Sequence, residues 1–536
     1  MATTLSRSET PVAYARLEER ILARDQQGAS EVFVDLVKDG RPLQELLRET
    51  VRIHAPYTHV PFHQRLDDGA VKFVNNDHCL LSARATLRLT DLMPRDHAWL
   101  PMGQTVWYIP TGLDPWNQLL GLAPGHYTRM YQLDVNAEPP PPQVHWPDQE
   151  PVFLDASFEA GLNHWLTLVQ RSEVLEAYRV FLGLFADEAK RRQLLSQLVF
   201  AGLIDIQDRM LFNRSYTTGH KAYRARATVE LGDVIGWDQA HAVVYAGVPD
   251  MGVGPHWYST YEMATNVCQQ LLEGRDHDLL ANRGELIPHE QAALEDVLLH
   301  GHEPAWQYLI TDLLKAGKGP KQILDVIQVA AAELMIQTGA PENYSMPQHT
   351  VEYCNTLGWY FEHFDHPHQL KLLYVAAAMT NQAAHNQAAY PQNGPVSIPR
   401  VRGIEAWDRP RILQRLDQAL LARDTDASLA LVSAYLRSEF DPAGLVQVLA
   451  IDSARFGNDP HNQEIGLCLL EDYVKSTALG RDRLLLGVVK NITGYRKYGD
   501  PLEAYARYAS AFGLSFAPAG AGAGGDAPAE ALLLED

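Results

Sequence analysis

The stretch RPLQELLRETVRI (residues 41–53) places apolar side chains at i, i+3, i+4 and i+7, the spacing of one face of an amphipathic α-helix. The next long segment, AVKFVNNDHCLLSARATLRLTDLM (70–93), continues this periodicity. Helical segments separated by short loops then follow, and alternating β patterns are almost absent. The sequence therefore predicts an all-α protein, a large multi-helix bundle or helical-repeat-like array. We expect fewer than about a tenth of residues 155–512 in strands.

Proline-rich and low-complexity stretches divide the chain into expected regions. The run NAEPPPPQVHWPDQEPVF (136–153) favours an extended linker, because each proline disfavours helical backbone in the residue before it. We expect an N-terminal helical region with a histidine-rich loop at 1–135, a central helical domain at 154–400 and a C-terminal helical region at 401–515. The tail at 516–536 is rich in alanine, glycine and proline, and we expect it to be disordered.

The composition limits the classes of partner. Lysine and arginine number 45 against 66 aspartates and glutamates, a formal charge of −21 that repels the phosphates of nucleic acids. The longest apolar stretches are too short to span a bilayer, and the N-terminus carries no apolar signal segment. The four cysteines lie far apart without CxxC spacing, which is typical of reduced core residues. We expect a cytoplasmic protein with neither a membrane nor a nucleic-acid partner.

Histidines gather in VRIHAPYTHVPFHQRL (51–66), which holds three of the chain's 21. Pro56 and Pro61 prevent a single helix from running through this stretch, and Pro61 suits the first turn of a new helix. A loop fixed by two prolines can hold His59 and His63 in the constant geometry that a metal site needs. The alternative interpretation is a set of surface or helix-capping histidines.

A second pattern suggests an internal duplication in the central domain. His220 precedes Tyr245, and His349 precedes Tyr374, by the same 25 positions. Each histidine lies near an expected helix start, and each tyrosine lies in a following helix. If the two helix pairs are related by a pseudo-twofold axis, both imidazoles point into one cavity, within about 10 Å of each other, as ligands of a shared metal would. Coincidence is the alternative explanation.

Two more residues extend this hypothesis. Lys221 follows His220 near a helix start, where the positive end of the helix dipole disfavours a cation. Its side chain reaches solvent in the simplest interpretation; in the other, carbamylation converts it into an anionic oxygen ligand. The stretch NNDH, which ends at His78, could supply a further ligand.

These segments carry a family resemblance. A histidine-rich early segment, then AGLIDIQDRMLFNRSYTTGHKAYRARA (201–227), then SMPQHTVEYCNTL (345–357), resembles the questin-oxidase-like helical proteins over about half of the chain. Some members of that family are oxygenases of polycyclic aromatic substrates. The resemblance implies a mononuclear non-haem iron bound by histidines and a carboxylated lysine. The corresponding positions are His59, His63, His220, Lys221 and His349.

The function that we expect is that of a metal-dependent oxygenase acting on a hydrophobic or aromatic small molecule. Imidazoles would dominate the ligand set because the thiols are scattered, and together with a lysine carbamate or carboxylate oxygen they favour iron over zinc, copper or nickel. Two alternatives stay open. The chain could be a non-catalytic helical scaffold or a subunit of a larger complex, or its histidines could serve a hydrolase or isomerase as acid and base without a metal. P-loop, HExxH and GxSxG motifs are absent from the sequence.

Overall fold

A computed structural model describes most of the chain. The described residues are 10–55, 64–65, 71–72, 78–112, 149–206, 219–252, 256–339, 345–457, 460–494, 502–514 and 532–535. The predicted ligands His59 and His63 lie outside them, as do most of the 136–153 linker and most of the 516–536 tail.

The predicted all-α fold is confirmed. The strands that the structure describes are only two residues long and form two antiparallel pairs. In the first, β1 (Gln64–Arg65) pairs with β2 (Val71–Lys72), and in the second, β3 (Arg400–Val401) pairs with β4 (Leu534–Glu535). The four cysteines are buried and make no disulfide, as expected of core residues.

The chain divides into two compact units, each built from separate stretches of sequence. Unit 1 comprises residues 1–87, 105–277 and 359–375, and unit 2 comprises residues 88–104, 278–358 and 376–536. The consecutive regions expected from the sequence stay a prediction, and the contact-based units differ from them in being discontinuous.

Unit 1 contains the N-terminal helices and a central set. They are η1 (Val12–Tyr14), α1 (Ala15–Leu22), α2 (Gln26–Lys38), α3 (Leu43–His54), α8 (Phe158–Gln170), α9 (Val174–Phe185), α10 (Arg191–Ile204), α11 (His220–Ile235), η5 (Trp237–Gln239), α12 (His241–Gly247), η6 (Pro249–Gly252) and α13 (Ser259–Leu271).

Unit 2 contains a second set of helices. They are η3 (Thr90–Leu92), α15 (Pro288–His300), α16 (Glu303–Lys315), α17 (Pro320–Gln337), η8 (Ile404–Ala406), α20 (Arg409–Ala422), α21 (Thr425–Arg437), α22 (Ala443–Arg455), α23 (Pro460–Lys475), α24 (Asp482–Gly494) and α25 (Glu503–Phe512). The remaining helices contain the points where the chain passes from one unit to the other. They are α4 (Cys79–Leu89), α5 (Leu100–Gly112), α14 (Asp276–Leu279), α18 (Ser345–His363) and α19 (Lys371–Ala388).

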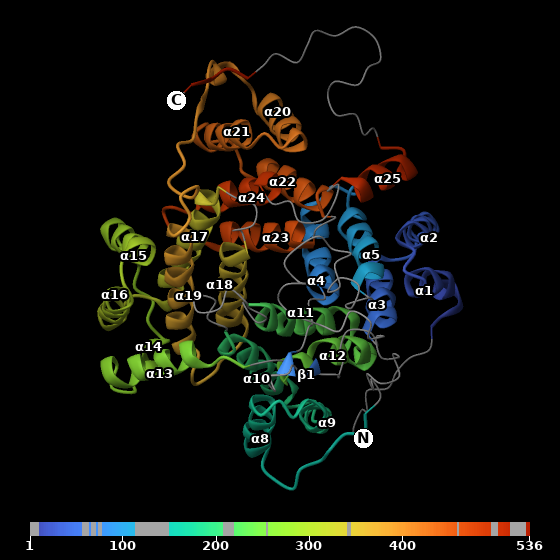
Figure 1. Cartoon of the computed structure of the whole chain (residues 1–536), viewed down its shortest axis with the longest axis vertical. Coiled ribbons are helices and arrows are strands. Elements are labelled where there is room, and N and C mark those ends of the chain that lie inside the picture. The colour runs from blue at the N-terminus through green and yellow to red at the C-terminus, as the bar shows by residue number, and fades with distance from the viewer. Residues whose placement is uncertain are drawn as a thin grey trace. The chain divides into compact units, whose positions relative to one another are not determined.

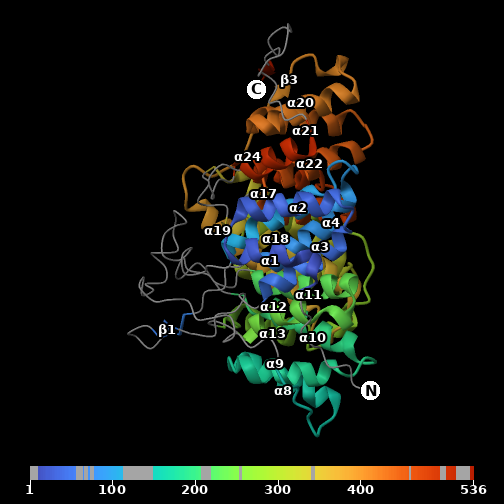
Figure 2. The same ribbon diagram turned by 90° about the vertical axis from the view of Figure 1, so that its right-hand side faces the viewer.

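Short polar side chains fix where several helices begin. Ser157 precedes α8, and its hydroxyl accepts a hydrogen bond from the backbone N–H of Ala160 at 3.2 Å. Asp408 caps α20 and Asp424 caps α21 in the same way. Because the loops that join them are short, α8 lies beside α9 and α20 beside α21, as Figures 1 and 2 both show. Local signals of this kind allow helices to be predicted from the sequence.

Helix α11 forms the core of unit 1 although it carries several charges. It begins after Gly219, whose φ of 100° is a left-handed conformation that glycine adopts without a steric penalty. Arg84 and Arg226 are 0% and 1% exposed, and both donate to the Glu230 carboxylate, at 2.7 and 3.1 Å. Arg84 also donates to the Tyr223 hydroxyl at 3.0 Å. The buried charges of α11 are therefore compensated within unit 1.

Helix α10 approaches α11 closely at Gly202. A Cβ atom added there would lie 2.7 Å from the carbonyl oxygen of Lys221 and 2.8 Å from the Cα of Ala222. Both are backbone atoms, so they cannot be moved aside by a change of rotamer. The lack of a side chain at Gly202 thus allows the end of α10 to reach the start of α11.

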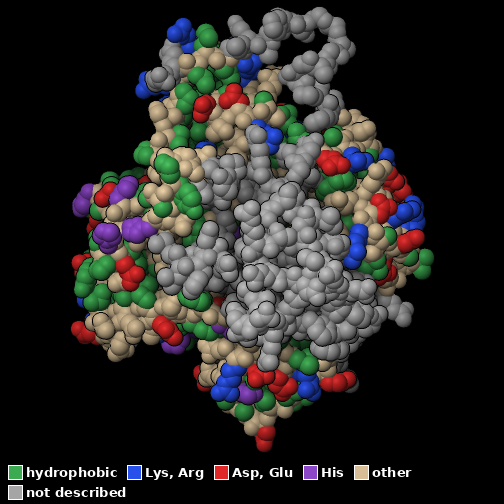
Figure 3. All heavy atoms as spheres, viewed as in Figure 1, with side chains coloured by type: hydrophobic (Ala, Val, Ile, Leu, Met, Phe, Trp, Pro, Cys, Tyr) green, Lys and Arg blue, Asp and Glu red, His purple; other side chains and the backbone are tan. Residues whose placement is uncertain are grey.

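The surface carries charges of both signs. In the face drawn in Figure 3, acidic and basic side chains are interspersed over the described atoms rather than gathered by sign. In the described part of the chain, no helix combines the length and the apolar character needed to cross a membrane.

Candidate functional site

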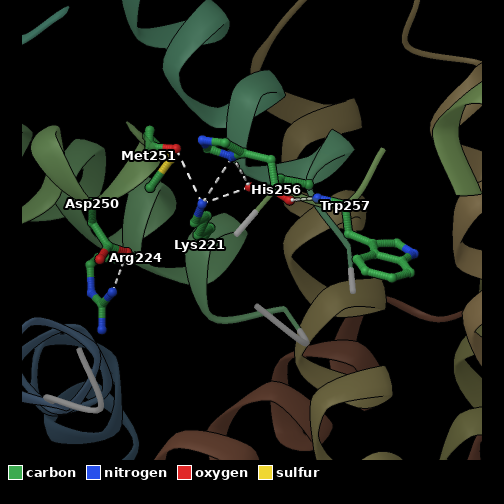
Figure 4. A network of polar contacts seen from close by, with 7 residues as sticks. Lys221, Arg224, Asp250, Met251, His256 and Trp257 are labelled. Carbon is green, nitrogen blue, oxygen red and sulfur yellow. Dashed lines mark hydrogen bonds and ion pairs between the residues drawn. The ribbon is translucent and has the colours of Figure 1, made fainter. Parts of the chain in front are cut away.

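A buried polar cluster in unit 1 joins three segments that are distant in sequence (Figure 4). Asp205 directly follows α10, Lys221 is the second residue of α11, and His256 lies shortly before α13. Their side chains are 1%, 4% and 8% exposed. The close approach of α10 to α11 explains how Asp205 and Lys221 come together.

Asp205 accepts hydrogen bonds from three donors. Lys221 Nζ lies 2.6 Å and His256 Nδ1 lies 2.7 Å from the same oxygen, Oδ2. The backbone N–H of Trp257 donates to Oδ1 at 2.7 Å. Lys221 Nζ also donates to the carbonyl oxygen of Met251 at 3.2 Å. Both carboxylate oxygens are therefore engaged, and the imidazole is held in one orientation.

These contacts decide the tautomer of His256. An ionised carboxylate only accepts hydrogen bonds, so Nδ1 must carry the proton that points to Asp205. In the neutral ring, Nε2 then carries a lone pair. Nε2 is buried and has no hydrogen-bond partner among the residues that the structure describes. The cluster thus presents one unused acceptor.

The lysine keeps the carboxylate ionised. Burial alone would raise the pKa of Asp205, but the Lys221 ammonium and the hydrogen bond from His256 outweigh it and lower the pKa from 3.8 to about 2. Tyr258 stacks on the His256 ring, with centroids 5.5 Å apart and planes at 12°. Burial, and then the nearby Asp205 charge, raises the pKa of Tyr258 well above its ordinary range, so this ring is neutral.

The lowered pKa of Asp205 predicts how stability depends on pH. A carboxyl whose pKa is lower in the folded state stabilises the fold above its unfolded pKa, and this contribution is lost as pH falls through the folded pKa. We expect wild type to lose about 2 kcal/mol of unfolding free energy relative to Asp205→Asn between pH 5 and pH 2, about 1.4 kcal/mol per pKa unit. Urea denaturation of both proteins at each pH measures this difference. Parallel pH profiles would contradict the prediction.

The environment of Lys221 bears on the predicted carbamate ligand. Its contact with Asp205 is an ion pair that uses the ammonium form, whereas a carbamate would place a second anion beside the carboxylate. Nearby on the same helix, Arg224 makes a buried ion pair with Asp250 (Figure 4). The ion pair therefore accounts for the position of Lys221 without a metal, and its role as a ligand stays a prediction.

A pair of histidines lies in the same unit. The rings of His78 and His220 meet edge to face with centroids 5.1 Å apart, and a nitrogen of each lies within 4.8 Å of the other. His78 is 2% exposed and lies just before α4, and His220 opens α11. Two imidazoles are fewer than the three or four protein ligands usual in a zinc site, so this pair alone does not define a metal centre.

A second group of candidate donors lies in unit 2, around His349. His349 and Glu352 are one turn apart on α18, with candidate ligand atoms within 4.8 Å of each other. The ring of His461, at the start of α23, lies 6.1 Å from that of His349, centroid to centroid, and almost perpendicular to it. His349 and His461 are each 4% exposed, and Glu352 is 1% exposed. His349 thus lies beside the Glu352 carboxylate of its own helix and beside the His461 ring of α23.

Amide side chains fix these helices against one another within unit 2. Gln348, the neighbour of His349, donates to the Asn491 side chain of α24 at 2.8 Å. Asn491 in turn donates to the carbonyl oxygen of His461 at 3.4 Å. Two turns further along α18, Asn355 donates to Asp472 of α23 at 2.7 Å. Contacts of α18 with α24 and with α23 therefore fix the positions of the candidate ligands.

The predicted ligands are distributed between the two units. His220 and Lys221 lie at the start of α11 in unit 1, and His349 lies one turn into α18 in unit 2. Tyr245 lies on α12 and Tyr374 on α19, the α-helices that follow, as the duplicated pattern predicts. The convergence of His220 and His349 on one cavity, and the duplication itself, stay predictions.

Sequence reasoning missed four residues that the structure brings into these clusters: Asp205, His256, Glu352 and His461. One signal was present. The spacing His-x-x-Glu occurs at 349–352 and again at 461–464, and residues three apart lie on the same side of a helix. No comparable signal joins Asp205 to His256, which are 51 positions apart.

Comparison with known proteins adds no assignment. No family model matches the chain, and it has no match among curated proteins or solved structures.

Proposed function

We propose that the protein is a metal-dependent oxygenase of a hydrophobic or aromatic small molecule, with its metal bound in unit 2 by His349, Glu352 and His461. The observation that carries this proposal is the donor set. Two imidazoles and one carboxylate are the protein ligands of many non-haem iron(II) oxygenases, in which the other coordination positions stay open for substrate and oxygen. Iron is therefore the metal that we propose.

The burial of the three side chains supports a bound cation. Glu352 is 1% exposed, so its carboxylate would bind a cation with little competition from bulk water, and the attraction between opposite charges is stronger inside a protein than in water. A divalent ion beside His349 and His461 would gain from that attraction. The imidazoles coordinate in their neutral form, so they add no positive charge that would repel the ion.

The surroundings of His349 support a hydrophobic ligand. Met346, one turn earlier on α18, packs in an apolar cluster with Leu334, Ala383 and Ala384. These side chains would exclude water from the start of α18. An iron ion bound there would supply the chemistry of oxygen activation, while the protein side chains would orient the ion and exclude water from the site.

Metal content tests this proposal. Wild type, His349→Ala and His461→Ala are purified, loaded with iron(II) without oxygen, desalted and examined by elemental analysis. We expect close to one iron per chain in wild type and at least about tenfold less in each variant, since losses of even indirect partners cost about 10 to 100-fold in affinity. Oxygen uptake by the loaded proteins in the presence of polycyclic aromatic compounds then tests the oxygenase assignment.

The matched control is His241→Ala, which removes a buried histidine, 7% exposed, from α12 of unit 1. This variant should keep the iron of wild type. Equal and near-zero iron in all four proteins would overturn the proposal and favour a non-catalytic helical scaffold. Iron that binds without any oxygen uptake would retain the metal centre and overturn the oxygenase activity.

A further inference from the structure

The Asp205–His256 pair of unit 1 has a feature that the proposed metal centre does not explain. A buried acceptor that lacks a hydrogen bond costs about 1–3 kcal/mol, so such a group is uncommon in a folded core. His256 Nε2 is such an atom among the described residues, and its side chain is 8% exposed. The opposite nitrogen, Nδ1, is fixed by Asp205 at 2.7 Å. This arrangement orients a lone pair that the protein itself leaves unused.

We propose that His256 Nε2 is the proton-accepting atom of a second binding site, which takes an uncharged molecule with a weakly acidic hydroxyl group, an enol or a phenol. Asp205 is the positioning residue that sets the tautomer and compensates the imidazolium that would form. This inference does not depend on a bound metal.

The charges of the cluster select this class of ligand. A lone pair accepts a hydrogen bond only from a donor, and this disfavours a carboxylate or phosphate at Nε2. The Lys221 ammonium lies 3.5 Å from Nδ1 of the same ring and disfavours a cationic ligand or a metal ion. An uncharged hydrogen-bond donor remains. Proton transfer to an imidazole is most efficient when the two acidities are similar, which favours enols and phenols over simple alcohols.

The proton transfer is balanced within the site. The O–H bond of the ligand breaks, an N–H bond forms at Nε2, and the electron pair stays on the ligand oxygen. The positive charge of the imidazolium is compensated by Asp205, whose oxygen already accepts from Nδ1. No oxidant or reductant is required. Tyr258 stacks on the imidazole and does not compete for the proton, because its hydroxyl is kept neutral by burial.

The binding of 4-nitrophenol tests the proposal, because its ionised form absorbs visible light and its neutral form does not. The titration uses the full-length protein in a buffer near neutral pH, where an imidazole still has its lone pair and a large fraction of the free probe is neutral. We expect the ionised form to increase above its level in buffer alone, with a stoichiometry of one bound probe per chain. In His256→Asn, which keeps a donor near the position of Nδ1 and removes Nε2, we expect at least about tenfold weaker binding, the loss of one hydrogen bond.

Two controls complete the experiment. His300 pairs with Asp296 at 3.1 Å on the surface, so His300→Asn removes a comparable but exposed pair and should leave the titration unchanged. The methyl ether 4-nitroanisole, which lacks the proton, should not compete with the probe. The proposal is overturned if wild type fails to ionise the probe, if His256→Asn ionises it equally well, or if the ether competes. The wild-type result alone is decisive should the variant fail to fold.

Discussion

Replacing Glu230 by glutamine is expected to lower the free energy of unfolding by about 3–5 kcal/mol, the usual cost of removing one partner from a buried ion pair. Glu230 is 4% exposed, and its Oε2 accepts from both Arg84 and Arg226, which lie almost wholly inside unit 1. Glutamine keeps the shape of the side chain but removes the negative charge. The guanidinium groups of both arginines would then stay buried with less compensation. Urea denaturation followed by circular dichroism at pH 7 measures the loss.

The matched control is Glu503→Gln on α25. Glu503 contacts Arg507 at 3.3 Å, but both side chains are more than two-fifths exposed. Such surface pairs contribute less than about 1 kcal/mol, because water already solvates both charges. A loss of similar size in the two variants would show that Glu230 acts through something other than its buried charge.

Replacing Asp205 by asparagine is expected to have a similarly large effect at pH 7, a loss of about 3–5 kcal/mol. The variant leaves the Lys221 ammonium inside unit 1 without its carboxylate, and it weakens the hydrogen bonds from His256 and Trp257. Thermal and urea denaturation both report this loss. It should be smallest at low pH, where the wild-type carboxyl is itself protonated.

A double-mutant cycle separates the charge from the shape of this site. Lys221→Met alone leaves the Asp205 carboxylate buried without its ammonium, so it should also destabilise the protein. The double variant Asp205→Asn, Lys221→Met removes both charges and should be more stable than the sum of the two single losses implies. Additive losses would mean that the ion pair contributes little, and that Asp205 acts mainly through its bonds to His256 and Trp257.

Much of the fold could be predicted because its signals are local. The apolar spacing in residues 41–53 corresponds to α3, which runs from Leu43 to His54. Helices α20 and α23 likewise lie within the C-terminal helical region expected at 401–515. A helix needs only its own apolar face and its caps to be recognised. The assembly of each unit from separate stretches depends on contacts between remote segments, so periodicity could not reveal it.

The candidate sites were less predictable for the same reason. Helix α11 contains Lys221, Arg224, Arg226 and Glu230, and a pattern so rich in charge indicates a solvated helix rather than a core one. Its burial becomes tolerable only through partners from elsewhere in the chain, such as Arg84. In unit 2, the repeated His-x-x-Glu spacing could have drawn attention to Glu352 and His461, whereas the histidine loop drew it to residues outside the described structure.

The orientation of the buried His256 depends on Gly202, the glycine at which α10 meets α11. Gly202 carries no functional group and contacts no ligand, yet a single methyl group there would press on the backbone of Lys221. Separating the two helices would lengthen the 2.6 Å contact between Lys221 and Asp205, and the orientation of His256 depends on that carboxylate. The ability of His256 to accept a proton thus depends on the size of residue 202, although that residue takes no part in proton transfer. A larger residue at position 202 would weaken or abolish proton transfer at His256 even if every polar side chain of the site stayed unchanged.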